Sequence, residues 1–219
     1  MTVYSPVKTF QAVRERAFRF CAERDWGKFH IPASIALALA GEVGEICEIF
    51  QWRGNLESYP EAEEFSEREL VHVGEEIADV FIYTTRLSDI CNVDLAFAVQ
   101  CKVNGTRYSL RSGTEEWHAQ SLDKLTSTSF VKNTLFRSQR HVCFALLKEV
   151  GKLCAIFERR PESECRVGLA CWNTGEVQVL ADHLATICLL LSCLAKFTKT
   201  SLCHCITDKF LKNAKKYPA

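Results

Sequence analysis

Apolar residues recur along most of the chain every three or four positions, with polar and charged residues between them. This is the period of an amphipathic helix, and it predicts a first helix over residues 10–23 and a second over residues 32–52. Pro32 supports the second assignment, because proline favours the first turn of a helix. A capping-box signature at residues 66–69 predicts a third helix that runs to about Cys91.

A fourth helix is expected to start at residues 92–94 and to end near Tyr108, although Gly105 weakens the pattern near its end. Residues 53–65 contain Gly, Asn and Pro and indicate a loop, and residues 109–115 contain Ser-Gly-Thr and indicate a linker. No stretch shows the alternation of a half-buried strand. The sequence therefore predicts an all-α fold.

The helical pattern of the first half starts again after the linker. Shifted by 107 positions, residues 37–50 fall on residues 144–157, with Glu-Val-Gly and Cys at the same places in both. We interpret this as a tandem duplication of a four-helix unit, with one unit over residues 1–111 and the other over residues 112–219. Two fused units would bury their apolar faces against each other as a pseudo-dimeric helical bundle.

The charge balance argues against two classes of partner. Lys and Arg together number 27, as do Asp and Glu, so no net field attracts nucleic acid or an anionic membrane. No apolar run is long enough to span a bilayer.

Twelve cysteines without a Cys-x-x-Cys motif or a secretory leader indicate reduced thiols in a cytoplasmic protein. The cluster Cys203-His204-Cys205 would point its side chains apart on a helix, so we do not expect zinc there.

Two acidic pairs stand out within the apolar helices. Glu42 and Glu45 lie three residues apart in the second helix, and Glu76 and Asp79 have the same spacing in the third. This spacing places both members of a pair on one helix face, one turn apart. One such pair is ordinarily a solvated face, but four carboxylates among apolar residues repel one another unless a cation lies between them. An oxygen-only ligand set suits Mg2+, so the pattern predicts a metal site that receives a polyphosphate.

The residues around these pairs resemble a known family. The segments Asp-Trp-Gly-Lys-Phe-His at 25–30, Gly-Glu-Val-Gly-Glu at 41–45, Phe-Gln-Trp at 50–52 and Glu-Glu-Ile-Ala-Asp-Val-Phe-Ile-Tyr at 75–83 carry the resemblance. They look like the MazG-like all-α nucleoside triphosphate pyrophosphohydrolases, and in particular their dCTP pyrophosphatase branch. The resemblance covers about residues 10–108, half of the chain.

The resemblance implies an Mg2+-dependent hydrolase that converts dCTP, and modified dCTP, to dCMP and pyrophosphate, and so sanitises the nucleotide pool. The metal ligands would be Glu42, Glu45, Glu76 and Asp79, and we expect Glu45, with Glu42, to serve catalysis. The positions that match the base and sugar site are Trp26, His30, Trp52 and Tyr83. The phosphate-binding tail, a Lys followed by Asn, basic residues and Tyr, matches Lys102, Asn104, Arg107 and Tyr108, although this copy is two residues short.

The second copy lacks most of these residues. The four acids of the first copy correspond to Glu149, Lys152, Val179 and Asp182, and Lys152 can neutralise the remaining carboxylates in place of a metal ion. Asn133, Arg137 and Arg159 replace the aromatic positions. The second half should therefore be a structural partner, which leaves one active site per chain. Its tail is complete, however, and we expect Asn213 and Lys215 to reach across to the working site.

Other functions fit parts of the same pattern. An all-α dUTPase uses similar acidic pairs and would prefer a different base. A ferritin-like di-metal bundle would use Glu69-x-x-His72, but that class needs two such motifs and the chain has one. A non-catalytic scaffold or nucleotide-binding protein would turn over no nucleotide. Beyond the substrate, the partner expected is another pseudo-dimer of the same kind in a homo-oligomer.

Overall fold

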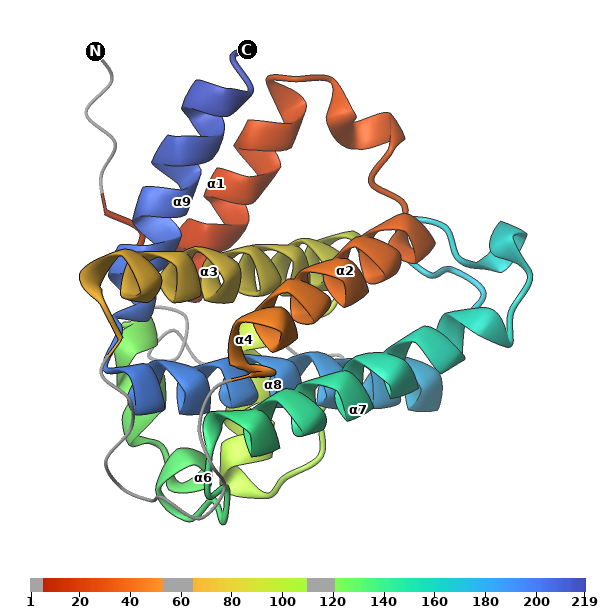
Figure 1. Ribbon diagram of the computed structural model, residues 1–219. Coiled ribbons are helices and arrows are strands. Elements are labelled where there is room, and N and C mark those ends of the chain that lie inside the picture. Colours follow the sequence, from red (N-terminus) through yellow and green to blue (C-terminus); the bar gives the residue numbers. More distant parts are fainter. Residues whose placement is uncertain (1–5, 53–64, 110–120) are drawn as a thin grey trace.

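A computed structural model describes residues 6–52, 65–109 and 121–219, and every regular element in these ranges is a helix (Figure 1). The all-α prediction is therefore confirmed for this part of the chain. The longer helices are α1 (Phe10–Ala22), α2 (Pro32–Phe50), α3 (Glu67–Ile90), α4 (Leu95–Asn104), α7 (Gln139–Glu158), α8 (Thr174–Thr198) and α9 (Leu202–Lys216). The short ones are η1 (Trp26–Lys28), η2 (Leu122–Ser127), α6 (Ser129–Lys132) and η3 (Glu162–Glu164).

The starts of α1 and α3 lie close to their predicted positions because local side chains satisfy the terminal backbone groups. Thr9 caps α1 by accepting a hydrogen bond from the backbone of Ala12. The predicted capping box is present at α3: the backbone N–H of Ser66 donates to Glu69 Oε2 at 2.8 Å, and Ser66 Oγ accepts from the backbone of Glu69 at 3.3 Å. Such reciprocal bonds satisfy two of the unpaired N–H groups at a helix start.

The predicted end of the fourth helix is wrong. Helix α4 ends at Asn104 rather than near Tyr108, because Gly105 adopts a left-handed conformation with φ of 66° and closes the helix by bonding back to its last turn. Glycine accepts this conformation without the steric cost of a Cβ atom. The predicted loop at 53–65 and linker at 109–115 lie, apart from Phe65 and Ser109, outside the described residues.

The C-terminal helix of each half packs on the long helix of the other half. Helix α9 lies with α1 against α3, whereas α4 packs on α8 and makes only slight contact with α3, the helix that precedes it (Figure 1). Helices α2 and α7 also pack side by side, and each contacts the long helix of its own half, α3 and α8 respectively. In the second half, residues 121–138 contain η2 and α6 where the first half has α1.

Helix α8 forms the centre of the core. It is long and apolar enough to cross a membrane by length and composition, but 78% of its most apolar window is buried inside the protein. Its middle turns carry Leu184, Ile187 and Cys188, and all three side chains are fully buried. Burying one leucine or isoleucine side chain contributes about 1.5–3 kcal/mol, so α8 is a main source of the stability of the fold.

Candidate active site

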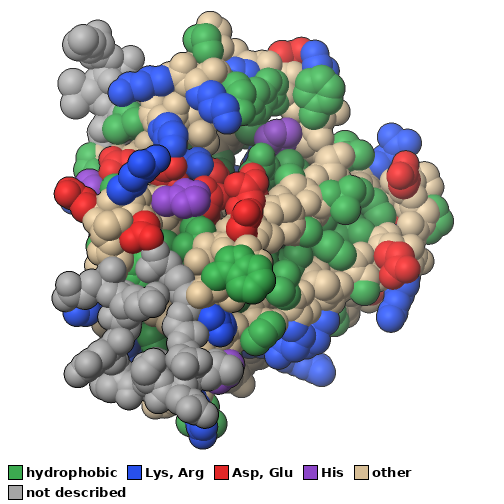
Figure 2. Space-filling model, viewed as in Figure 1, with side chains coloured by type: hydrophobic (Ala, Val, Ile, Leu, Met, Phe, Trp, Pro, Cys, Tyr) green, Lys and Arg blue, Asp and Glu red, His purple; other side chains and the backbone are tan. Residues whose placement is uncertain are grey.

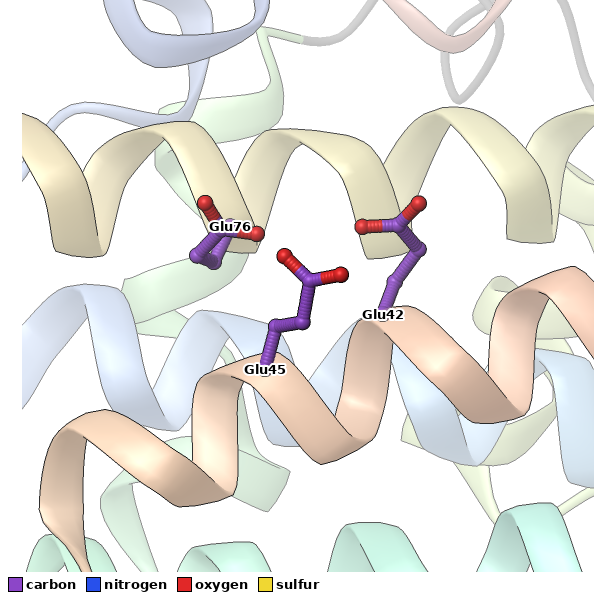
Figure 3. A group of neighbouring side chains, drawn as sticks. All are labelled: Glu42, Glu45 and Glu76. Carbon is purple, nitrogen blue, oxygen red and sulfur yellow. The ribbon is translucent and has the colours of Figure 1, made fainter.

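Helices α2 and α3 present the acidic residues to one another. Glu42 and Glu45 extend from α2 toward Glu76 on α3, and one carboxylate oxygen from each lies within 4.8 Å of the others (Figure 3). Buried residues on the core-facing sides of the two helices, Val43 and Ile77 among them, hold the helices together at this level. Asp79 lies one turn after Glu76. The structure therefore brings together the two acidic pairs that the sequence singled out.

Burial and mutual repulsion make Glu42, Glu76 and Asp79 hard to ionise. The pKa of Glu42 is raised to about 7, first by burial and then by the negative charges of Asp79, Glu45 and Glu76. Burial also raises the pKa of Glu76 and that of Asp79, although the nearby Lys209 ammonium opposes both shifts. A bound cation offsets the negative charges of such a group of acids and therefore stabilises the site.

The donor atoms fit a hard divalent cation such as Mg2+. All are carboxylate oxygens, the ligand type that Mg2+ prefers. Glu76 Oε2 is buried without a hydrogen-bond partner, and Glu76 Oε1 lies 3.4 Å from His72 Nε2. A buried oxygen without a partner costs free energy, and a metal ion would satisfy it. Glu42, Glu45 and Glu76 could hold the ion, whereas Asp79, the fourth predicted ligand, forms an ion pair with Lys209.

Helix α9 of the second half closes this side of the site. The Lys209 ammonium forms an ion pair with Asp79, and both side chains are largely buried. Burial alone would lower the pKa of Lys209, but its bond to Asp79 and the charges of Glu76 and Glu75 raise it. Lys212, one turn on, pairs with Glu75. Figure 2 shows the result on the surface, where acidic side chains gather on one face with basic side chains beside them.

A cavity of about 190 Å3 opens beside the acids. Helices α1, α2, α3 and α9 and the η1 turn supply its walls. It is smaller than the pockets of about 300–1,000 Å3 that enclose whole drug-sized ligands, so it suits a base and sugar better than a complete nucleotide. The lining residues are Ala17, Phe20, Cys21, Trp26, His30, Glu42, Asp79, Ile82, Tyr83, Arg86, Lys209, Phe210, Asn213, Lys216 and Tyr217.

The cavity has an aromatic end. The Trp26 ring meets Phe20 and Tyr217 edge to face, with centroids 5.7 and 5.3 Å away, and His30 lies 6.3 Å from it. Burial and the charges of Glu42 and Asp79 raise the pKa of Tyr83 to about 12. Tyr83 is therefore a neutral hydroxyl between the aromatic end and the acids. Such a wall can stack on a flat ring and offer polar groups to its edge.

Four predicted substrate-binding residues line this cavity: Trp26, His30, Tyr83 and Asn213. Lys215 is not among the lining residues, whereas its neighbour Lys216 is. Trp52 is 87% exposed just after the end of α2 and is not among them either. The structure thus places one end of the predicted aromatic site, and part of the predicted tail, at a single cavity.

The tail of the first half lies elsewhere. The Lys102 ammonium donates to both carboxylate oxygens of Asp182 at 2.8 Å, which is the reciprocal of the pair between Lys209 and Asp79. Tyr108 is buried, and its hydroxyl accepts a hydrogen bond of 3.0 Å from the backbone of Asp94. Asn104 and Arg107 are exposed at the end of α4. None of these four tail residues lines the cavity.

The corresponding acid of the second half is neutralised by protein groups. Glu149, which the predicted repeat aligns with Glu42, receives Lys152 Nζ at 3.1 Å and His183 Nδ1 at 2.8 Å. Burial alone would raise the pKa of Glu149, but these two partners lower it. The Glu149 carboxylate is therefore already paired with basic side chains of the protein, one of which is Lys152, as expected. Asp182 pairs with Lys102.

A hollow of about 550 Å3 lies between the end of α7 and the start of α8. Arg160, one of the residues that line it, is paired with both Glu164 and Glu176. The alternative ferritin-like motif also lacks a free first ligand, because Glu69 serves the capping box of α3. The acidic cluster on α2 and α3 is therefore the metal site that the described residues favour.

Sequence reasoning missed several residues of the cavity. Lys209 was not among the predicted site residues, and no local pattern indicates that α9 packs on α3. Arg86 lies seven residues after Asp79, two turns along the same face of α3, which is a signal that could have been used. Cys21 and Tyr217 gave no such signal.

Curated proteins are similar to about half of this chain. No protein-family model matches the chain. The chain is 44% identical over 107 residues to dCTP pyrophosphatase 1 of Homo sapiens, and 43% identical over 104 residues to the proteins of that name from Bos taurus and Rattus norvegicus. These matches cover 48% of this chain and 60–62% of the relatives. The chain thus spans about three fifths of the length of the curated relatives it matches.

Proposed function

We propose that this chain is an Mg2+-dependent pyrophosphohydrolase that converts dCTP, and modified dCTP, to dCMP and pyrophosphate, and so serves sanitation of the nucleotide pool. The observation that carries the proposal is the group of three carboxylates within 4.8 Å, one with an unpartnered buried oxygen, beside an aromatic cavity. The similarity to dCTP pyrophosphatase 1 proteins supports the choice of substrate.

The acids have two tasks in this proposal. Glu42, Glu45, Glu76 and Asp79 hold Mg2+, which, when bound, offsets the negative charge of the triphosphate and polarises the α-phosphorus. Glu45 is the most exposed of the three clustered glutamates, and we assign it as the base that takes a proton from the attacking water. The water oxygen forms a bond to the α-phosphorus, the bond from that phosphorus to the α,β-bridging oxygen breaks, and pyrophosphate leaves with the electron pair.

The cavity binds the nucleoside end of the substrate. Trp26 offers a face for stacking on the base, and His30 offers a polar edge. Tyr83, between them and the acids, contacts the sugar and excludes a 2′-hydroxyl. Asn213 and Lys216 on α9 contact the triphosphate as it passes from the cavity to the acids, which assigns the role predicted for Lys215 to its neighbour.

The two halves have different roles. The first, over residues 1–111, supplies the acids, and the second, over residues 112–219, supplies α9 and a core helix. The reciprocal pairs of Lys102 with Asp182 and of Lys209 with Asp79 support the idea of a duplicated unit, in which each copy lends its last helix to the other. All twelve cysteines are free, which is consistent with a reducing compartment such as the cytoplasm.

A pyrophosphate-release assay tests the proposal. Purified chain is offered dCTP, 5-methyl-dCTP, dUTP, dTTP and CTP, with Mg2+ or with EDTA. We expect Mg2+-dependent release that is fastest with the deoxycytidine nucleotides, and loss of release in Glu42→Gln and Asp79→Asn. Glu149→Gln, the matched change in the second half, should retain turnover.

Each alternative predicts a different result in the same assay. Preference for dUTP would favour the dUTPase alternative. Absence of turnover on every nucleotide would favour a non-catalytic protein and would refute the proposal. Retained turnover in either first-half variant would refute the site assignment.

A further inference from the structure

A chain of hydrogen-bonded polar groups links His30 to Arg86, Asp89 and Arg14. Arg86 Nε donates a hydrogen bond of 3.2 Å to His30 Nδ1, and the other side of the same guanidinium donates to Asp89 Oδ2 at 2.7 Å. Asp89 Oδ1 in turn accepts from Arg14 Nε at 2.8 Å. The chain runs from the solvent at Arg14 to the cavity at His30, and its middle members come from α3.

The Arg86 guanidinium is held in one orientation. Its side chain is only 10% exposed, and Asp89 provides the opposite charge that a buried arginine requires. Two partners at different nitrogen atoms fix both the position and the plane of a rigid guanidinium. The Nε–H bond therefore points at the imidazole as a consequence of the fold and not of a flexible side chain.

This contact decides which nitrogen of His30 carries the proton. Arginine Nε always carries hydrogen and never accepts, so His30 Nδ1 must present its lone pair. The ring proton of the neutral imidazole then lies on Nε2. Cys21 Sγ lies closer to Nδ1, at 3.3 Å, than to Nε2, at 3.9 Å, and His30 lines the cavity. Burial and the charge of Arg86 also lower the pKa of His30, which keeps the ring neutral.

We propose that Arg86, oriented by Asp89, is a positioning residue that holds His30 as a hydrogen-bond donor toward the base and thereby selects cytosine over uracil and thymine. Cytosine has two adjacent acceptors, N3 and O2, whereas uracil and thymine carry a hydrogen on N3 and repel a donor there. The selection rests on the proposed function, because it requires a pyrimidine in the cavity.

Nuclear magnetic resonance on the whole chain tests the hydrogen bond directly. An N–H···N bond transmits a measurable scalar coupling between its two nitrogen atoms. In 15N-labelled protein we expect a coupling between Arg86 Nε and His30 Nδ1, with Nδ1 at the shift of an unprotonated ring nitrogen. The imidazole is assigned from the signals lost in His30→Gln. A protonated Nδ1, or no coupling in the wild type, would overturn the proposal.

Nucleotide binding tests the selectivity. The double variant Arg86→Met/Asp89→Leu removes the buried ion pair as a unit, which is better tolerated than removing one partner. We expect its preference for dCMP over dUMP, measured as a ratio of dissociation constants, to fall by about fivefold, the worth of one hydrogen bond. Arg14→Met removes the exposed outer contact to Asp89 and should leave the ratio unchanged.

The outcomes separate the two proposals. Equal weakening of dCMP and dUMP in the double variant would show a merely structural role for Arg86 and would overturn the inference. Because both readouts use monophosphates or no ligand, they do not depend on turnover. A chain that hydrolyses no triphosphate but shows the coupling and the altered ratio would refute the proposed function alone.

Discussion

Replacing Glu42 with glutamine should stabilise the metal-free protein while removing its response to Mg2+. Glu42 lies among three other carboxylates, and its pKa is raised to about 7 by burial and by their charges. A carboxyl group with a higher pKa in the folded than in the unfolded chain binds its proton more tightly when folded. The contribution of Glu42 to the unfolding free energy is therefore fully present below pH 4.5, the ordinary pKa of a glutamate, and is lost as the pH rises through about 7.

The size of the effect follows from the shift. A rise from 4.5 to about 7 corresponds, when Glu42 is fully ionised, to about 3 kcal/mol of unfolding free energy. Glu42 is partly exposed, and solvent screening reduces the figure to about 1–2 kcal/mol. Glutamine has nearly the same shape and no charge, so the variant should recover this amount at pH 7.5. Mg2+ at 100 times its dissociation constant stabilises a competent site by about 2.7 kcal/mol, and the variant should lose most of that gain.

Urea denaturation at pH 5 and pH 7.5, with EDTA or with Mg2+, measures both quantities. The matched control is Glu149→Gln, because the repeat aligns Glu149 with Glu42 but His183 and Lys152 satisfy its charge. The lowered pKa of Glu149 means that its stabilisation is present above pH 4.5 and is lost in acid. This variant should lose about 1.5–3 kcal/mol at pH 7.5 and keep its Mg2+ response. If Glu42→Gln were less stable than the wild type in EDTA at pH 7.5, the electrostatic reasoning would be refuted.

Three further predictions concern the core, the ion pair and the tail. Phe81→Ala should lower the unfolding free energy by about 3–5 kcal/mol, because the ring is fully buried. Trp52→Ala, at an exposed position, should change the unfolding free energy by no more than about 0.5 kcal/mol. Thermal denaturation of the two variants measures both effects. Lys209→Met leaves its buried carboxylate partner, Asp79, unpaired and should lower the unfolding free energy by about 3 kcal/mol in EDTA. Adding Mg2+ should then raise the unfolding free energy of the variant by more than that of the wild type. An equal rise in the two proteins would contradict the role of Lys209 as an internal cation. Asn213→Ala should raise the KM for dCTP about tenfold, whereas Lys215→Ala should change it less than twofold, and steady-state kinetics that gave equal effects would count against the assignment of the cavity wall.

Local sequence determined the helices and the acidic faces. The period of apolar residues and the capping box at Ser66 placed the first three helices to within about two residues, because both signals act over one or two turns. The spacing of Glu42 with Glu45 and of Glu76 with Asp79 fixed which carboxylates share a face, since helix geometry alone decides that. Gly105 marked the end of α4, although the sequence pattern alone extended the helix beyond it.

Only the tertiary structure decided which helices meet. Periodicity shows that a helix has an apolar face, but the partner of that face depends on the shape and volume of side chains far away in the sequence. The packing of α9 on α3 brings Lys209 and Asn213 to the acids, and Lys102 goes to Asp182 by the reciprocal packing of α4 on α8. Arginine is usually found on the protein surface, so the sequence does not indicate a role for Arg86. Its role appears only when the fold places His30, from a loop 56 positions earlier, against it. The sequence thus set the chemistry each helix carries, and long-range packing selected which of those groups form a site.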